Sequence, residues 1–101
     1  MPNVKADQLR TIAAGLMEAA GAKPEHAAII ARHVTGANLA GHDSHGIILV
    51  PTYIDRIGRG HLVPDAPFEI VRETATTTVI DGHWGFGYVG SERAMRMTID
   101  K

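Results

Sequence analysis

The sequence contains no cysteine. Disulfide bonds, thiolate metal sites and cysteine nucleophiles are therefore excluded within these 101 residues, and the composition is compatible with a reducing cytoplasm. Long apolar runs are missing as well, since none approaches the roughly 20 residues of a membrane-spanning helix. The net charge is only −1, so electrostatics gives no reason to expect nucleic acid or an anionic membrane as a partner. We expect a cytoplasmic protein that binds neither.

Three helices are predicted in the first part of the chain. Apolar residues at steps of three and four indicate a helix from Ala6 to Ala20, which Gly21 should stop. A second helix should begin at Pro24, whose fixed φ suits the first helical position, and end before Gly41. A third is predicted from Ser44 to Ile57, with Gly58 and Gly60 ending it.

The third predicted helix has two unusual features. Residues 47–50 are apolar on every side, which implies burial all round. Pro51 lies inside the helical pattern and should kink or split the helix.

The residue types change after a turn-rich connector at residues 61–67. Residues 68–72 and 76–81 predict two short strands, which can form a hairpin although the joining loop lacks an Asn-Gly or Asp-Gly turn. Residues 91–101 predict a further helix. The fold class is therefore α/β, with an N-terminal helical domain at residues 1–67 and the start of an α/β domain at residues 68–101. Two strands are too few for an independent sheet, so we expect the second domain to be incomplete.

Two imidazoles, a carboxylate and a hydroxyl are concentrated at the junction of the second and third predicted helices, in the run Gly41-His42-Asp43-Ser44-His45-Gly46. Asp43 and Ser44 are both good N-caps, because their oxygens can accept hydrogen bonds from the free N–H groups of a first helical turn. His45 would then lie near the positive end of the helix dipole, which favours a neutral imidazole able to exchange protons near neutral pH.

Two interpretations of this run are open. In the first, His45 transfers a proton and its neighbour Ser44 holds the ring. In the second, the run is a helix cap with a solvated histidine, since capping explains Asp43 and Ser44 without chemistry. No metal site is predicted, because His26 and His33 lack the three- or four-residue spacing of helical ligand pairs.

Glycines at positions 82, 85, 87 and 90 lie between the second predicted strand and the last predicted helix. A strand, a glycine loop and a helix form the arrangement in which backbone N–H groups receive a phosphate. The spacing of Gly85, Gly87 and Gly90 matches the dinucleotide-binding fingerprint only formally, because aromatic residues crowd the loop. The alternative is a tight turn packed under Trp84, and no individual cofactor-binding residue is predicted.

Together these motifs resemble a known family. The run from Gly41 to Gly46, then Pro51-x-Tyr53, Gly60 and Asp81-Gly82-x-x-Gly85-Phe86-Gly87, resembles the malate/L-lactate dehydrogenase family of the second type. This family also includes ureidoglycolate, sulfolactate and hydroxycarboxylate dehydrogenases and the reductases of cyclic imino acids. Its fold is unrelated to that of the Rossmann-type lactate and malate dehydrogenases, so the resemblance implies an atypical, non-Rossmann cofactor domain.

The resemblance implies an oxidoreductase that transfers a hydride between NAD or NADP and the C2 carbon of a 2-keto acid, 2-hydroxy acid or cyclic imine. The family histidine corresponds to His45, which would protonate the developing alkoxide or amine. The family serine corresponds to Ser44, which would relay the proton or orient the ring. Both assignments agree with the proton-transfer interpretation. Family enzymes are dimers, so the resemblance also implies a homodimer.

Two differences from the family pattern qualify these expectations. Many members carry an arginine four residues after the histidine, where it can bind the substrate carboxylate, and this sequence has Leu49 there. Members closer to the hydroxycarboxylate dehydrogenases also lack that arginine. Family enzymes are much longer, so we expect the N-terminal part of such an enzyme, inactive by itself. The alternative is a catalytically inactive helical interaction module.

Overall fold

A computed structural model describes residues 3–101 and begins with three α-helices. These are α1 (Ala6–Ala19), α2 (Pro24–Leu39) and α3 (Val50–Gly58). Two short 3-10 helices, η1 (Asp43–His45) and η2 (Ile47–Leu49), join α2 to α3. Within the described residues, no helix has the length and the apolar composition needed to cross a bilayer.

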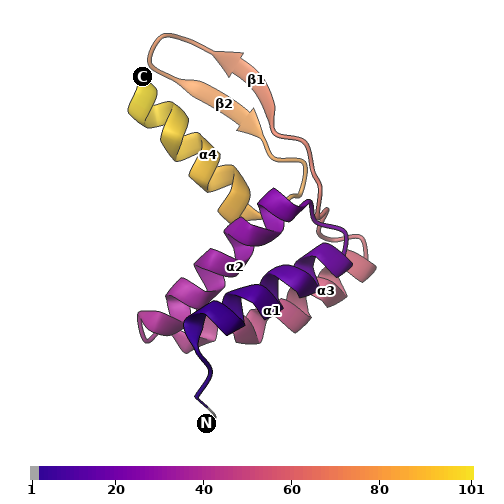
Figure 1. Cartoon of the computed structure of the whole chain (residues 1–101). Coiled ribbons are helices and arrows are strands. Elements are labelled where there is room, and N and C mark those ends of the chain that lie inside the picture. Colours follow the sequence, from indigo (N-terminus) through magenta and orange to yellow (C-terminus); the bar gives the residue numbers. More distant parts are fainter. Residues whose placement is uncertain (1–2) are drawn as a thin grey trace.

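The second part of the chain is a hairpin followed by a helix. Strands β1 (Glu69–Glu73) and β2 (Thr78–Asp81) pair antiparallel and are followed by α4 (Gly87–Asp100). Figure 1 shows α1, α2 and α3 gathered at one end of the molecule and the hairpin with α4 at the other. The predicted mixture of an N-terminal helical part and a β-hairpin with a helix is confirmed.

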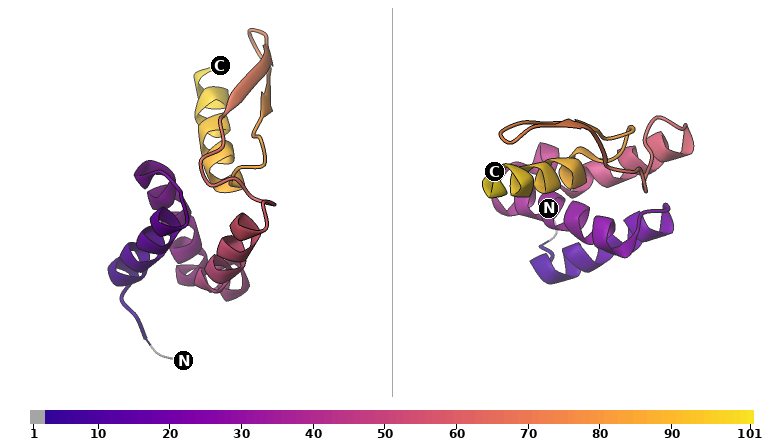
Figure 2. Two further views of the ribbon diagram at one scale, coloured as in Figure 1. Left: turned by 90° about the vertical axis from the view of Figure 1, so that its right-hand side faces the viewer. Right: turned by 90° about the horizontal axis from the view of Figure 1, so that it is seen from above.

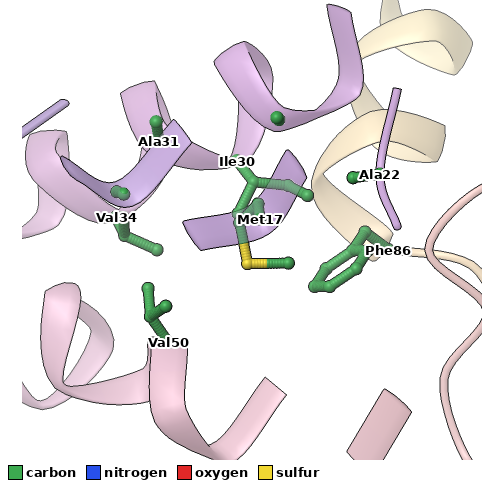
Figure 3. Close-up of a cluster of buried hydrophobic side chains, with 9 residues drawn as sticks. Met17, Ala22, Ile30, Ala31, Val34, Val50 and Phe86 are labelled. Carbon is green, nitrogen blue, oxygen red and sulfur yellow. The ribbon is translucent and has the colours of Figure 1, made fainter. Parts of the chain in front are cut away.

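The helical part is held together by a small apolar core. Met17 of α1 and Ile30 and Val34 of α2 are fully buried, and Val50 at the start of α3 is 1% exposed. Figure 3 shows these side chains directed into one shared region. The other core positions of α1 and α2 are alanines, which allow two helices to approach closely: Ala13, Ala27 and Ala31.

All three N-terminal helices end at a glycine in the left-handed conformation. After α2, the N–H of His42 donates to the carbonyl of Ala37 at 2.8 Å, and the N–H of Gly41 donates to the carbonyl of Asn38 at 3.0 Å. This pair of bonds is the Schellman motif, which needs a positive φ that glycine adopts without strain, and Gly41 has φ +80°. The predicted helix stops are therefore confirmed.

Phe86 joins the second part of the chain to this core. It immediately precedes α4, is 7% exposed, and packs edge-on against Tyr53 of α3 with ring centroids 5.4 Å apart. The hydroxyls of Tyr53 and Tyr88 share a hydrogen bond of 2.7 Å. Burial, and then this hydrogen bond, raises the pKa of Tyr53 well above its usual range.

Helix α4 lies along the hairpin without burying it, since every residue of β1 is exposed. Ile70 lies opposite Ile80 in the register, and a bulge follows Ile70 on β1. Figures 1 and 2 show α4 running alongside the two strands. Lys101 fixes the far end of this arrangement by donating to the carbonyl of Thr74 at 2.8 Å. The predicted hairpin is confirmed, with slightly shorter strands.

Four expectations about the helices are wrong. Helix α3 begins at Val50 and not at Ser44, because the intervening residues form the two 3-10 helices. Pro51 therefore lies in the first turn of α3, where a missing N–H is tolerated, and it neither kinks nor splits the helix. Ile48 is 67% exposed, so residues 47–50 are not buried on all sides. Helix α4 begins earlier than predicted, at Gly87.

Glu92 fastens α4 to α2. Its carboxylate is only 19% exposed and accepts hydrogen bonds from Arg32 and, at 3.1 Å, from Nε2 of His33. Arg96 adds a bond of 3.2 Å from within α4. The bond from Arg32, followed by that from His33, lowers the pKa of Glu92 from 4.5 to about 2. The two parts of the chain are thus joined by the apolar contact of Phe86 and by this ion-pair cluster.

This cluster predicts a pH-dependent stability. A carboxylate whose pKa is lowered by folding stabilises the fold fully above its unfolded pKa, and the contribution is lost as pH falls through the folded pKa. We predict that Glu92→Gln lowers Tm at pH 7 and that the difference from the parent shrinks between pH 4.5 and about pH 2. Thermal denaturation followed by circular dichroism measures the difference, with Glu18→Gln on the exposed side of α1 as the matched control. A difference that stays constant down to pH 2 would contradict the assignment.

Candidate active site

The run from Gly41 to Gly46 forms the connection between α2 and α3, at the end of the helical part that lies away from the hairpin (Figure 1). Ser44 and His45 both belong to η1. The Oγ of Ser44 lies 3.0 Å from Nδ1 of His45, which is a hydrogen bond. The ring of His42 meets the ring of His45 edge-on, with centroids 4.2 Å apart and planes at 88°. The structure therefore brings together the two residues predicted to act.

The helix cap expected by the second interpretation is not formed, although His45 is exposed as that interpretation expected. No side-chain cap is present at the start of η1, η2 or α3, whose cap positions are His42, Gly46 and Leu49. Ser44 bonds His45, and Asp43 bonds the preceding helix instead. The expected position of His45 in the first turn of an α-helix is also wrong, so the helix-dipole argument no longer applies to it.

Asn38, in the last turn of α2, was missed as a site residue. Its Oδ1 accepts a hydrogen bond from the N–H of Ile47 at 2.9 Å, and its Nδ2 donates to Oδ1 of Asp43 at 2.9 Å. Asn38 therefore caps the free N–H at the start of η2, a role that the sequence predicted for Asp43 or Ser44 inside the run. No local pattern indicates this contact, because nine residues separate Asn38 from Ile47.

The two residues predicted to act lie on the surface. Ser44 and His45 are both exposed. The cavity of about 450 Å³ in this structure lies elsewhere, and neither Ser44 nor His45 lines it. His45 can therefore exchange protons with another molecule, but nothing within residues 3–101 closes over it and excludes water.

The 450 Å³ cavity lies beside the glycine loop, between the start of α2 and the first turn of α4. Lys23, His26 and Arg93 line it together with the four glycines of the loop. Gly85 is needed there, because a Cβ at this position would come within 2.8 Å of the Cβ of Ala66. The arrangement of strand, glycine loop and helix is as predicted, and phosphate binding by it stays a prediction.

The alternative interpretation of this loop is wrong. Trp84 is 81% exposed, so the turn does not pack beneath it. The aromatic residue that anchors the loop is Phe86. His83 and Trp84 both have positive φ, at 49° and 62°, so the sharp reversal after β2 is made by residues other than glycine.

The loop and His45 lie toward opposite ends of α2. Lys23 and His26, at the N-terminal end of α2, line the cavity, whereas His45 follows the C-terminal end. Helix α2 has 16 residues. At the standard rise per residue its length is about 24 Å. The glycine loop therefore does not border the candidate proton-transfer site.

One group of side chains in the described part of the chain has the composition of a metal site, although none was predicted. Glu69, Asp81 and His83 lie at the end of the hairpin opposite its turn, with one ligand atom of each within 4.8 Å of the others. Nε2 of His83 is 2.5 Å from Glu69 and 3.8 Å from Asp81. Both carboxylates therefore face the same ring nitrogen at the surface. The sequence did not indicate the grouping, because it arises from the pairing of β1 with β2.

Comparison with known proteins identifies the chain. The family model described as malate/L-lactate dehydrogenase matches residues 4–101. The chain belongs to the malate/L-lactate dehydrogenase family. The family resemblance drawn from the motifs is therefore confirmed. Leu49, where the sequence resemblance leads us to expect arginine in many members, is half-buried at the end of η2.

Individual family members match over most of this chain. Hydroxycarboxylate dehydrogenase B of Escherichia coli is 40% identical over 81 residues, which cover 80% of this chain and 22% of the relative. L-sulfolactate dehydrogenase of Methanothermobacter thermautotrophicus is 40% identical over 79 residues, which cover 77% and 23%. The crystal structure of malate dehydrogenase from Entamoeba histolytica matches with a TM-score of 0.93 and 38% identity over 98% of this chain and 28% of that one. The chain thus spans about a quarter of the length of these family members.

Proposed function

We propose that this chain is the N-terminal part of an enzyme that transfers a hydride between NAD or NADP and a small 2-keto or 2-hydroxy acid. The observation that carries the proposal is the hydrogen bond of 3.0 Å between Ser44 and His45 in the family motif. The named relatives, which are hydroxycarboxylate, L-sulfolactate and malate dehydrogenases, support the substrate class. Residues 1–67 would form the helical domain and residues 68–101 the start of a non-Rossmann cofactor domain.

His45 would be the acid and base of the reaction. Because Nδ1 is held by Ser44, Nε2 is the ring nitrogen that can exchange a proton with substrate. In the reduction, a hydride adds to C2, the π bond of the carbonyl breaks, and the oxygen takes up the electron pair. Protonated His45 then gives its Nε2 proton to that oxygen and becomes neutral, with Nδ1–H donating to Ser44. Oxidation of the hydroxy acid runs through the same steps in reverse.

The nicotinamide cofactor would supply or accept the hydride when bound. Within this chain, the residues that fit a phosphate-bearing part of it are Lys23, Arg93 and the glycines around the cavity. Hydride transfer, however, requires the reacting atoms to approach to about 3–3.5 Å. The glycine loop lies toward the other end of α2 from His45 and does not meet this requirement. Segments outside these 101 residues would therefore position the nicotinamide.

We also propose that the active protein is a homodimer. Several large apolar side chains are more than half exposed: Ile48 at 67%, Val71 at 58%, Val79 at 55% and Trp84 at 81%. Apolar groups exposed in this number favour contact with another protein surface. The remainder of the same chain and a second copy would cover them together, and the second copy is supported by the family resemblance.

The first functional prediction concerns His45. In the full-length enzyme, His45→Ala should lower kcat by roughly 10²–10⁴, the usual contribution of a general acid or base. The fold should survive, because His45 is exposed and fills no core position. Steady-state reduction of 2-keto acids, followed by NADH or NADPH absorbance, measures the change. His42→Ala removes the neighbouring ring and is the matched control, which should keep most of the activity. Near-normal kcat in His45→Ala would exclude the proposed role.

A second prediction concerns Leu49. An arginine there could bind a substrate carboxylate through charge-assisted hydrogen bonds, each contributing roughly 1.5–3 kcal/mol. Leu49→Arg in the full-length enzyme should therefore change the ranking of 2-keto acids by kcat/KM, with individual ratios shifted by about tenfold. Ile48→Arg adds the same charge at the exposed neighbouring residue and should leave the ranking unchanged. An unchanged ranking in Leu49→Arg would show that position 49 does not face substrate.

A third prediction concerns the 101-residue chain alone, which should not reduce 2-keto acids with NADH or NADPH. His45 supplies only a proton, and most of the catalysis depends on a positioned nicotinamide. The chain can be titrated with NADH while the fluorescence of Trp84 is followed, with the full-length Escherichia coli hydroxycarboxylate dehydrogenase B as positive control. Saturable micromolar binding together with turnover would show that the cofactor site lies within this chain.

A further inference from the structure

We propose that Asn38 is a positioning residue for proton transfer by His45, a role that rests on the function proposed above. Asn38 lies in the last turn of α2, and its side-chain amide bridges the two ends of the segment that carries Ser44 and His45. It would act on the reaction through the backbone of that segment, by fixing where His45 stands.

Both ends of the Asn38 amide are occupied. Oδ1 accepts from the N–H of Ile47 and Nδ2 donates to the carboxylate of Asp43, each at 2.9 Å. This pair of partners permits only one orientation of the amide, because an N–H requires an acceptor and a carboxylate requires a donor. The residues before Ser44 and after Gly46 are therefore tied to the same side chain.

Gly46 extends this contact to the residue that follows His45. Gly46 is buried, and a Cβ added to it would overlap the atoms of the Asn38 amide. The amide therefore packs directly against the backbone of Gly46. Asn38 constrains three positions of the connection, which are Asp43, Gly46 and Ile47, and His45 lies between the first two.

Apart from Asn38, the segment is held by short-range backbone hydrogen bonds, such as that from the N–H of His45 to the carbonyl of His42 at 3.0 Å. Helix η1 has three residues, none of them buried, so packing of its own side chains cannot fix the histidine. Helix α2, in contrast, is fixed by the packing of its own side chains, since Ile30 and Val34 are fully buried. Misplacement of a catalytic group by about 1 Å can lower a rate by about 10²-fold. A rigid connection from α2 to the segment would therefore keep His45 in the position that proton transfer requires.

The test exchanges the amide and the carboxylate in the full-length enzyme. Asn38→Asp keeps an acceptor for the N–H of Ile47. It also places a second carboxylate opposite that of Asp43, so the bond between positions 38 and 43 is lost and the two charges repel. Asp43→Asn alone preserves both hydrogen bonds, since its amide oxygen can accept from Asn38. In the double variant Asn38→Asp/Asp43→Asn, the N–H of Ile47 still donates to residue 38. The bond between positions 38 and 43 is restored with its donor and acceptor exchanged. Asn3→Asp makes the same substitution at an exposed residue outside the helices and is the matched control.

We expect Asn38→Asp to lower kcat by about tenfold with little change in KM, because the substrate still binds but the proton donor is misplaced. The solvent deuterium isotope effect on kcat should rise, since proton transfer becomes the slower step. Both quantities should return to parental values in the double variant, and Asp43→Asn and Asn3→Asp should resemble the parent throughout.

Parental kcat in Asn38→Asp would overturn the proposal, and so would a decrease that leaves the isotope effect unchanged or that the double variant does not recover. If Asn38→Asp is not recovered as folded protein, the double variant decides alone. A kcat of the double variant within about threefold of the parent supports the positioning role of Asn38, and a lower kcat overturns it.

His45→Ala in the same assay separates this proposal from the proposed function. An inactive parent enzyme, or parental kcat in His45→Ala, would remove the proposed function itself. Loss of activity in His45→Ala combined with full activity in Asn38→Asp would leave the function in place and remove only the role of Asn38.

Discussion

The burial of one face of α2 is the interaction on which the rest of this structure depends. Ile30 and Val34 are fully buried among residues of α1, α3 and the segment before α4. The opposite parts of the same helix make the polar contacts, with Arg32 and His33 binding Glu92 of α4. Because one helix carries both sets of contacts, α2 places the hairpin unit relative to the connection containing His45, together with the contacts of Phe86 and Tyr88 with Tyr53 of α3.

This arrangement separates the two groups that the proposed chemistry would need. His45, the proposed proton donor, follows the C-terminal end of α2, and the glycine loop proposed to hold phosphate lies at its N-terminal end. The length of α2 keeps them apart. Ser44 and His45 are also exposed, whereas a hydride-transfer site must exclude water to stabilise developing charge. Under the proposed function, surfaces beyond these residues would therefore complete the site.

Local signals in the sequence were sufficient for most of the fold. Apolar periodicity and the glycines at 21, 41 and 60 placed α1, α2 and the end of α3, because a Schellman end depends on a few adjacent residues. The hairpin was predicted without a recognised turn, which is made instead by Thr74, whose Oγ1 accepts from the N–H of Thr77 at 3.0 Å. The motif around His45 identified the candidate site. The start of α3 was mispredicted, because the hydrogen bond from the N–H of Ile47 at the start of η2 goes to Asn38, nine residues away, and has no local pattern.

That contact also explains why the motif can serve chemistry. A serine that caps a helix commits its oxygen to a backbone N–H, and an aspartate that does so is equally committed. Here Asn38 of α2 satisfies the N–H of Ile47, and neither Asp43 nor Ser44 caps a helix. The hydroxyl of Ser44 is therefore available to hold Nδ1 of His45, while Asp43 serves as the anchor for Asn38. The capping and proton-transfer interpretations of the sequence require the same oxygens. A side chain of the neighbouring helix takes the capping role, which leaves the hydroxyl of Ser44 bonded to His45.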